Sequence, residues 1–102
     1  MPISLQVIYP ITDGTSFDYD YYTERHLPMV GGVIGKFLQS KLVTKGLASG
    51  PGAAPGFYAV ATMVFADRQS FDAAMAVAGP VLADIPNFTD VKPEMLIGEV
   101  IG

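Results

Sequence analysis

The residues of this chain that can carry acid–base chemistry gather in one short segment, DYDYYTERHLPMV, at residues 18–30. This segment holds the only histidine, His26, and three of the five tyrosines. Asp18, Tyr22 and His26 are spaced four residues apart, so they share one face if the segment is helical. A carboxylate or phenol beside an imidazole fixes its tautomer and tunes its pKa towards neutrality. We therefore predict His26 as a catalytic general base or acid, with Tyr22 orienting it or the substrate and Asp18 tuning it.

A structural role is the alternative for the same histidine. His26 stands two residues before Pro28, which withholds one backbone donor and crowds the preceding turn of a helix. His26 would then cap a helix that breaks at Leu27 and Pro28, and pack at the edge of a dimer. The two roles differ in whether a ligand-sized cavity lies beside His26.

Four further residues are candidates for ligand binding: Tyr9, Tyr21, Arg25 and Phe65. Tyr9 and Phe65 lie in predicted strands and would form walls of a pocket. Tyr21 would line a pocket or orient a ligand oxygen, although tyrosines on helices also anchor cores with the hydroxyl at the rim. Arg25 would bind an anionic substrate, or pair with a helix carboxylate on the surface.

Composition excludes several classes of partner. The 102 residues carry a net charge of −4, and six scattered basic residues make no nucleic-acid-binding stripe. One histidine, no cysteine and scattered carboxylates predict no metal site, and the glycines follow no phosphate-binding signature, so we predict no cofactor. No apolar run is long enough to span a bilayer. The start, MPISLQVIYP, lacks the features of a signal peptide, so we expect a cytoplasmic protein.

These residues must be positioned by regular elements, and the first half of the chain predicts three of them. Alternating hydrophobic residues predict a strand over 3–9. Ser16 is expected to N-cap a helix that runs to about Leu27, with a bend or restart at Pro28. Three glycines are expected to mark its exit: Gly31, Gly32 and Gly35. A second strand is predicted over 37–47, with lysines typical of an edge strand, Lys41 and Lys45.

The second half of the chain predicts the same strand-helix-strand order, without any sequence repeat. A surface loop rich in Gly, Ala and Pro is predicted over 48–56, followed by a strand over 57–66 that is apolar on both faces. Asp67 is expected to cap a helix that kinks or restarts at Pro80, and a last strand covers 94–102.

The order β-α-β-β-α-β predicts one α+β domain, residues 1–102, with the ferredoxin-like fold and a four-stranded antiparallel sheet. Two helices can cover only one face of such a sheet, so the doubly apolar strand needs a partner on the other face. Half of the residues are hydrophobic, and the mean hydropathy of +0.37 is high for a small monomer. We therefore predict a homodimer in which two sheets form a dimeric α+β barrel.

Three segments together resemble the EthD family, named for ethyl tert-butyl ether degradation: YYTERHLPMV at 21–30, VFADRQSFDAAMA at 64–76 and ADIPNFTDVKPEMLIGEV at 83–100. The resemblance covers nearly the whole chain except the loop at 48–56. It implies a dimeric α+β barrel and an association with monooxygenase-linked catabolism of apolar compounds. The family motif retains the position of His26.

The resulting prediction is an EthD-like protein that binds a small apolar or aromatic compound in the barrel and processes it without a cofactor. In this version the protein is a cofactor-independent, monooxygenase-like oxidoreductase. One alternative is a non-catalytic accessory or ligand-carrier protein for a monooxygenase system. Another is a small isomerase or cyclase that uses the same His26.

Overall fold

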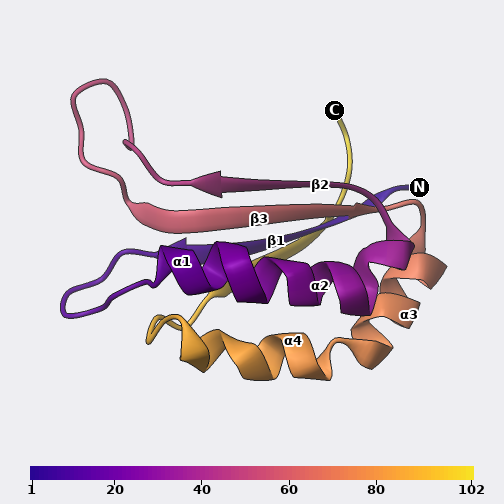
Figure 1. Cartoon of the computed structure of the whole chain (residues 1–102). Coiled ribbons are helices and arrows are strands. Elements are labelled where there is room, and N and C mark those ends of the chain that lie inside the picture. Colours follow the sequence, from indigo (N-terminus) through magenta and orange to yellow (C-terminus); the bar gives the residue numbers. More distant parts are fainter.

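A computed structural model describes residues 1–102 as a four-stranded antiparallel sheet with its helices on one face (Figure 1). The strand order is β2-β3-β1-β4. Its strands are β1 (Ile3–Pro10), β2 (Leu38–Lys45), β3 (Phe57–Phe65) and β4 (Glu94–Glu99). This topology confirms the predicted ferredoxin-like α+β fold, with the 37–47 strand at an edge of the sheet as expected.

One long helical segment follows β1 and combines four helical stretches without a break. They are α1 (Tyr19–Tyr21), the π-helical turn η1 (Tyr22–His26), α2 (Leu27–Ile34) and the 3₁₀ turn η2 (Gly35–Phe37). The helical backbone continues past Leu27, but α2 begins there with Pro28 in its first turn, which agrees with the expected restart. Gly31 and Gly32 lie inside α2 rather than at an exit. The wider π-helical turn ends two residues before Pro28, where it relieves the crowding that proline causes and lets the helical backbone continue.

The N-cap of this segment is also different from the prediction. Asp18, not Ser16, caps α1, and its Oδ1 accepts a hydrogen bond of 3.0 Å from the backbone N–H of Tyr21. The backbone N–H of Ser16 instead donates to Asp90 Oδ1 at 2.9 Å, which ties the loop before α1 to the loop before β4.

The second helical segment comprises α3 (Arg68–Val77), α4 (Gly79–Asp84) and the 3₁₀ turn η3 (Ile85–Asn87). Asp67 caps α3 as predicted, since its Oδ1 accepts from the backbone N–H of Ser70 at 2.8 Å. Pro80 lies in the first turn of α4, so the expected restart is confirmed. No helix is both long enough and apolar enough to cross a membrane.

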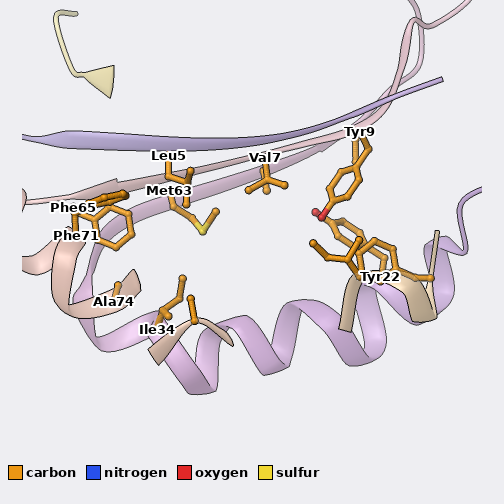
Figure 2. Packing of buried hydrophobic residues seen from close by; sticks show 14 residues of the cluster. Leu5, Val7, Tyr9, Tyr22, Ile34, Met63, Phe65, Phe71 and Ala74 are labelled. Carbon is orange, nitrogen blue, oxygen red and sulfur yellow. The ribbon is translucent and has the colours of Figure 1, made fainter. Parts of the chain in front are cut away.

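The core lies between the helices and one face of the sheet. Leu5, Val7 and Tyr9 alternate along β1, and Val7 faces Ala61 of β3 in the register. Figure 2 shows this layer, with Tyr9 and Tyr22 at one end and a second group at the other, comprising Phe65, Phe71 and Ala74. The opposite face of the sheet carries no helix (Figure 1), and Leu42 and Leu96 there are 67% and 54% exposed.

Candidate functional site

A cavity of about 310 Å³ lies between the sheet and the helices, and its walls are almost entirely hydrophobic. Leu5, Val7 and Met63 form the wall on the sheet, and α2 contributes Val30 and Ile34. The prediction placed the ligand site inside a barrel formed by two sheets. The cavity instead lies on the helical face of the sheet, within a single chain, because the interior of that layer is not completely filled by side chains.

His26 reaches this cavity from η1 and is fixed by a buried carboxylate. Its Nδ1 lies 2.9 Å from Oδ2 of Asp84, at the end of α4, and the two residues are 3% and 6% exposed. The other carboxylate oxygen, Oδ1, accepts from the Tyr21 hydroxyl at 2.7 Å and from the Asn87 amide at 3.0 Å. Asp84 therefore holds three side-chain partners around one buried charge.

These hydrogen bonds favour the ionised form of Asp84. The amide of Asn87, then the hydrogen bonds from His26 and Tyr21, hold the pKa of the Asp84 carboxyl below its ordinary value, although desolvation acts in the opposite direction. An ionised carboxylate can only accept hydrogen bonds, so Nδ1 of His26 carries its proton as the donor. Nε2 of the neutral ring is then a free acceptor.

The Nε2 atom of His26 has no hydrogen-bond partner in the protein. Every buried side-chain nitrogen and oxygen has a hydrogen-bond partner, whereas His26 makes its one hydrogen bond through Nδ1. Because Nε2 is not a buried atom without a partner, it must be accessible to solvent or to a ligand. The His26 side chain lines the cavity, so the cavity is the space from which Nε2 is reached. The ring stacks on Tyr22 at 5.5 Å between centroids and packs against Phe88 at 4.5 Å. Two aromatic rings thus fix the orientation of the imidazole.

Of the two other residues predicted to be catalytic, only Tyr22 lies beside His26 in the structure. Tyr22 lines the cavity beside His26, as the helical spacing suggested. Asp18 does not contact His26, because its carboxylate is used as the N-cap of α1. The carboxylate that bonds the imidazole belongs to Asp84, 58 residues away in sequence.

Of the four residues predicted to bind a ligand, only Tyr9 lines the cavity. Tyr21 lies outside it and donates its hydroxyl to Asp84, so it acts on His26 only through that carboxylate. Arg25 is exposed on η1 and forms no ion pair. Phe65 is fully buried, and its ring centroid lies 5.4 Å from that of Phe71. Neither Arg25 nor Phe65 lines the cavity.

Three residues of the site were not predicted from the sequence. Asp84 and Asn87 belong to DIPNFTD, a run whose composition predicts only a turn-rich connection. The signal for them was the likeness of this run to a family motif. Lys41, predicted as an edge-strand charge, also lines the cavity. No three His, Cys, Asp or Glu side chains come close enough to hold a metal ion together.

The fold is shared with solved structures of low sequence identity. An ethyl tert-butyl ether degradation (EthD) family protein from Bacillus halodurans C-125 superimposes with a TM-score of 0.77 at 22% identity, covering 99% of this chain and 100% of that one. SnoaB from Streptomyces nogalater, a cofactor-independent oxygenase, superimposes with a TM-score of 0.66 at 10% identity, covering 99% and 94%. No curated protein matches the sequence.

Sequence similarity is much stronger to one family. The EthD domain model matches residues 15–92, a range that includes both His26 and Asp84. An EthD-like protein from Ralstonia eutropha JMP134 is 41% identical, with a TM-score of 0.86, and the match covers 99% of this chain and 93% of that one. The chain belongs to the EthD family.

Proposed function

We propose that this protein binds a small apolar or aromatic compound in the cavity and processes it without a cofactor, using His26 as a general base, in oxidative, monooxygenase-linked degradation. One observation carries the proposal: a buried His26–Asp84 pair, with Nε2 left without a protein partner, in the wall of an apolar, ligand-sized cavity. Family membership and the fold shared with a cofactor-independent oxygenase support the oxidative setting.

The reaction supplied by these residues is proton transfer. Nε2 takes a proton from an acidic C–H or O–H of the ligand, and the electron pair stays on the ligand as a carbanion, enolate or phenolate. The ionised Asp84 stabilises the imidazolium that forms, while Tyr21 and Asn87 hold Asp84 in place. The apolar walls exclude water, which strengthens these interactions. Such an electron-rich anion is the form of an organic compound that dioxygen oxidises directly.

We also propose that the protein is a homodimer, because the uncovered face of the sheet exposes large hydrophobic side chains. Leu42 and Leu96 lie at the two ends of a row that crosses all four strands. A second sheet packed on this face would remove them from water. A cytoplasmic location stays a prediction from the sequence.

The proposal is tested by binding and by proton exchange. Native mass spectrometry with small aromatic, lactone and ether compounds and aromatic ketones should find one ligand per subunit. In D₂O, wild-type protein should exchange an acidic C–H of a bound compound for deuterium. His26→Gln should keep the ligand and lower the exchange rate by at least about 100-fold, the range of general-base catalysis.

Asp84→Asn gives the second variant, and Asp72→Asn is its matched control. The first substitution removes the negative charge beside Nδ1 of His26, so the exchange rate should fall by about 10-fold or more. Asp72 pairs with Arg68 on the surface at 3.2 Å, and its loss should leave the rate unchanged. Binding without any exchange would favour a ligand-carrier protein. A cavity that takes no compound would overturn the proposal.

A further inference from the structure

Two tyrosine hydroxyls in the cavity have no partner in the protein. Tyr9 and Tyr22 are each only 2% exposed, and neither hydroxyl takes part in a hydrogen bond. Because no buried side-chain oxygen is left without a partner, both hydroxyls must face open space. Both residues line the cavity, so this is the space that their hydroxyls face.

The two phenols meet at the same end of the cavity as His26. The Tyr9 and Tyr22 rings contact edge to face, with centroids 5.9 Å apart (Figure 2). The Tyr22 ring also stacks on the imidazole of His26. The Tyr9, Tyr22 and His26 rings therefore lie together in a cavity whose other walls are apolar apart from Lys41.

Both hydroxyls remain protonated donors. Burial raises the pKa of Tyr22 to about 12, and it raises the pKa of Tyr9 as well, with a further contribution from the nearby Tyr22. An accessible phenol hydroxyl that has no partner in the protein can donate its hydrogen bond to an acceptor on a ligand. An oxygen atom with two lone pairs can accept from both phenols at once.

We infer that Tyr9 and Tyr22 form a two-donor cradle for one ligand oxygen, so that the ligand is a small, mostly apolar ketone, enol or phenol. This inference rests on the proposed function, because it assigns the ligand class of the same cavity. His26 takes the proton from the carbon next to the carbonyl, or from the hydroxyl, of this ligand. The C–H or O–H electron pair moves into the conjugated system, and the negative charge develops on the oxygen that both tyrosines hold.

The experiment compares 1-indanone with indane, two bicyclic compounds of similar shape that differ in the carbonyl oxygen. Dissociation constants are measured by isothermal titration calorimetry for the wild type, Tyr9→Phe, Tyr22→Phe and the double variant. Each substitution removes one hydroxyl and keeps the ring. Tyr19→Phe is the matched control, since the Tyr19 hydroxyl donates to the backbone carbonyl of Tyr58 at 2.9 Å and lies outside the cavity.

Each single cavity variant should bind 1-indanone roughly 3- to 10-fold more weakly, the usual net value of one hydrogen bond, and the double variant should lose more. Binding of indane should be unchanged, which also shows that the cavity remains folded. Tyr19→Phe should bind both compounds like the wild type.

Two other results have different meanings. If both compounds bind but the ketone is held equally well by the double variant and the wild type, the cradle is overturned and the proposed function stands. If neither compound binds the wild type, the proposed function and the cradle are overturned together.

Discussion

The site depends on how a few polar groups are satisfied in a hydrophobic layer. Asp84 is a buried carboxylate, which would be costly without partners, and three side chains donate to it. The arrangement fixes the tautomer of His26 and leaves Nε2 to the cavity. Tyr9 and Tyr22 are the opposite case, because their hydroxyls have no protein partner. The carboxylate of Asp84 is thus satisfied by hydrogen bonds within the protein, whereas the two tyrosine hydroxyls are left for a group in the cavity.

The buried Tyr22 makes a prediction for alkaline stability. Its pKa rises from the ordinary 10.0 to about 12 on folding, so the unfolded chain releases this proton first. The stabilising contribution is complete below pH 10 and is lost as the pH rises through about 12. Relative to its own stability at neutral pH, Tyr22→Phe should lose less free energy of unfolding between these values than the wild type does. Urea unfolding at several pH values measures the difference, and equal losses would contradict it.

The π-helical turn η1 is the element that presents the site. Tyr22 and His26 lie at its two ends and are both buried, whereas Thr23, Glu24 and Arg25 between them are exposed. The turn therefore directs one aromatic and one imidazole to the cavity and keeps the charged residues in water. Pro28 follows two residues after the end of η1, and a wide turn at this point avoids the clash that the proline would cause in a regular helix.

The connection between β2 and β3 makes a prediction at the level of an element. A Cβ added at Gly46 would overlap the backbone carbonyl oxygen of Phe57, whereas a Cβ at Gly56 would meet nothing. The Gly46 N–H also donates to the Tyr58 carbonyl at 2.9 Å, which restricts any movement away. We expect Gly46→Ala to lower the free energy of unfolding by about 1–3 kcal/mol, the usual cost of overpacking.

Gly56→Ala is the control in the same connection and should change stability by less than about 0.5 kcal/mol. Urea denaturation of the two variants beside the wild type measures both values. Equal stabilities of the two variants would show that the β2–β3 connection moves freely to accept a side chain.

The molecule as a whole has one covered and one uncovered sheet face. On the uncovered face, the register aligns Leu42, Thr62, Gln6 and Leu96 across β2, β3, β1 and β4. Gln6 and Thr62 bond each other at 3.2 Å in the middle of this row, so their polar groups are satisfied within the sheet. The apolar ends of the row are then available to a second sheet.

The oligomeric state tests this interpretation. The wild type should have about twice the chain mass of 10.8 kDa in light scattering coupled to size-exclusion chromatography. Leu96→Lys places a charge on the uncovered face and should shift the protein towards the monomer. Leu47→Lys changes an even more exposed leucine, 83% exposed in the loop after β2, and should stay dimeric. A wild-type monomer would contradict the predicted barrel.

The fold could be predicted from the sequence, and the same sequence identifies His26 as the central residue of the candidate site. Alternation along β1, the continuous apolar run of β3 and the helical spacing after Asp67 depend only on neighbouring residues, so they predict strands and helices directly. Their order then predicts the ferredoxin-like arrangement. His26 is identifiable because it is the only imidazole in the chain.

The completion of the site, by contrast, depends on contacts between distant segments. Helical spacing suggested Asp18 as the partner of His26, but α4 packs beside η1 and brings Asp84 to the imidazole instead. The packing of η1 on the sheet brings Tyr9 of β1 to Tyr22, and the cavity lies on the helical face of the sheet. A local sequence pattern indicates only the secondary structure of its own segment, because it reflects the periodicity of that backbone. Contacts between distant segments depend instead on how the helices pack on the sheet and on the volumes that their side chains fill.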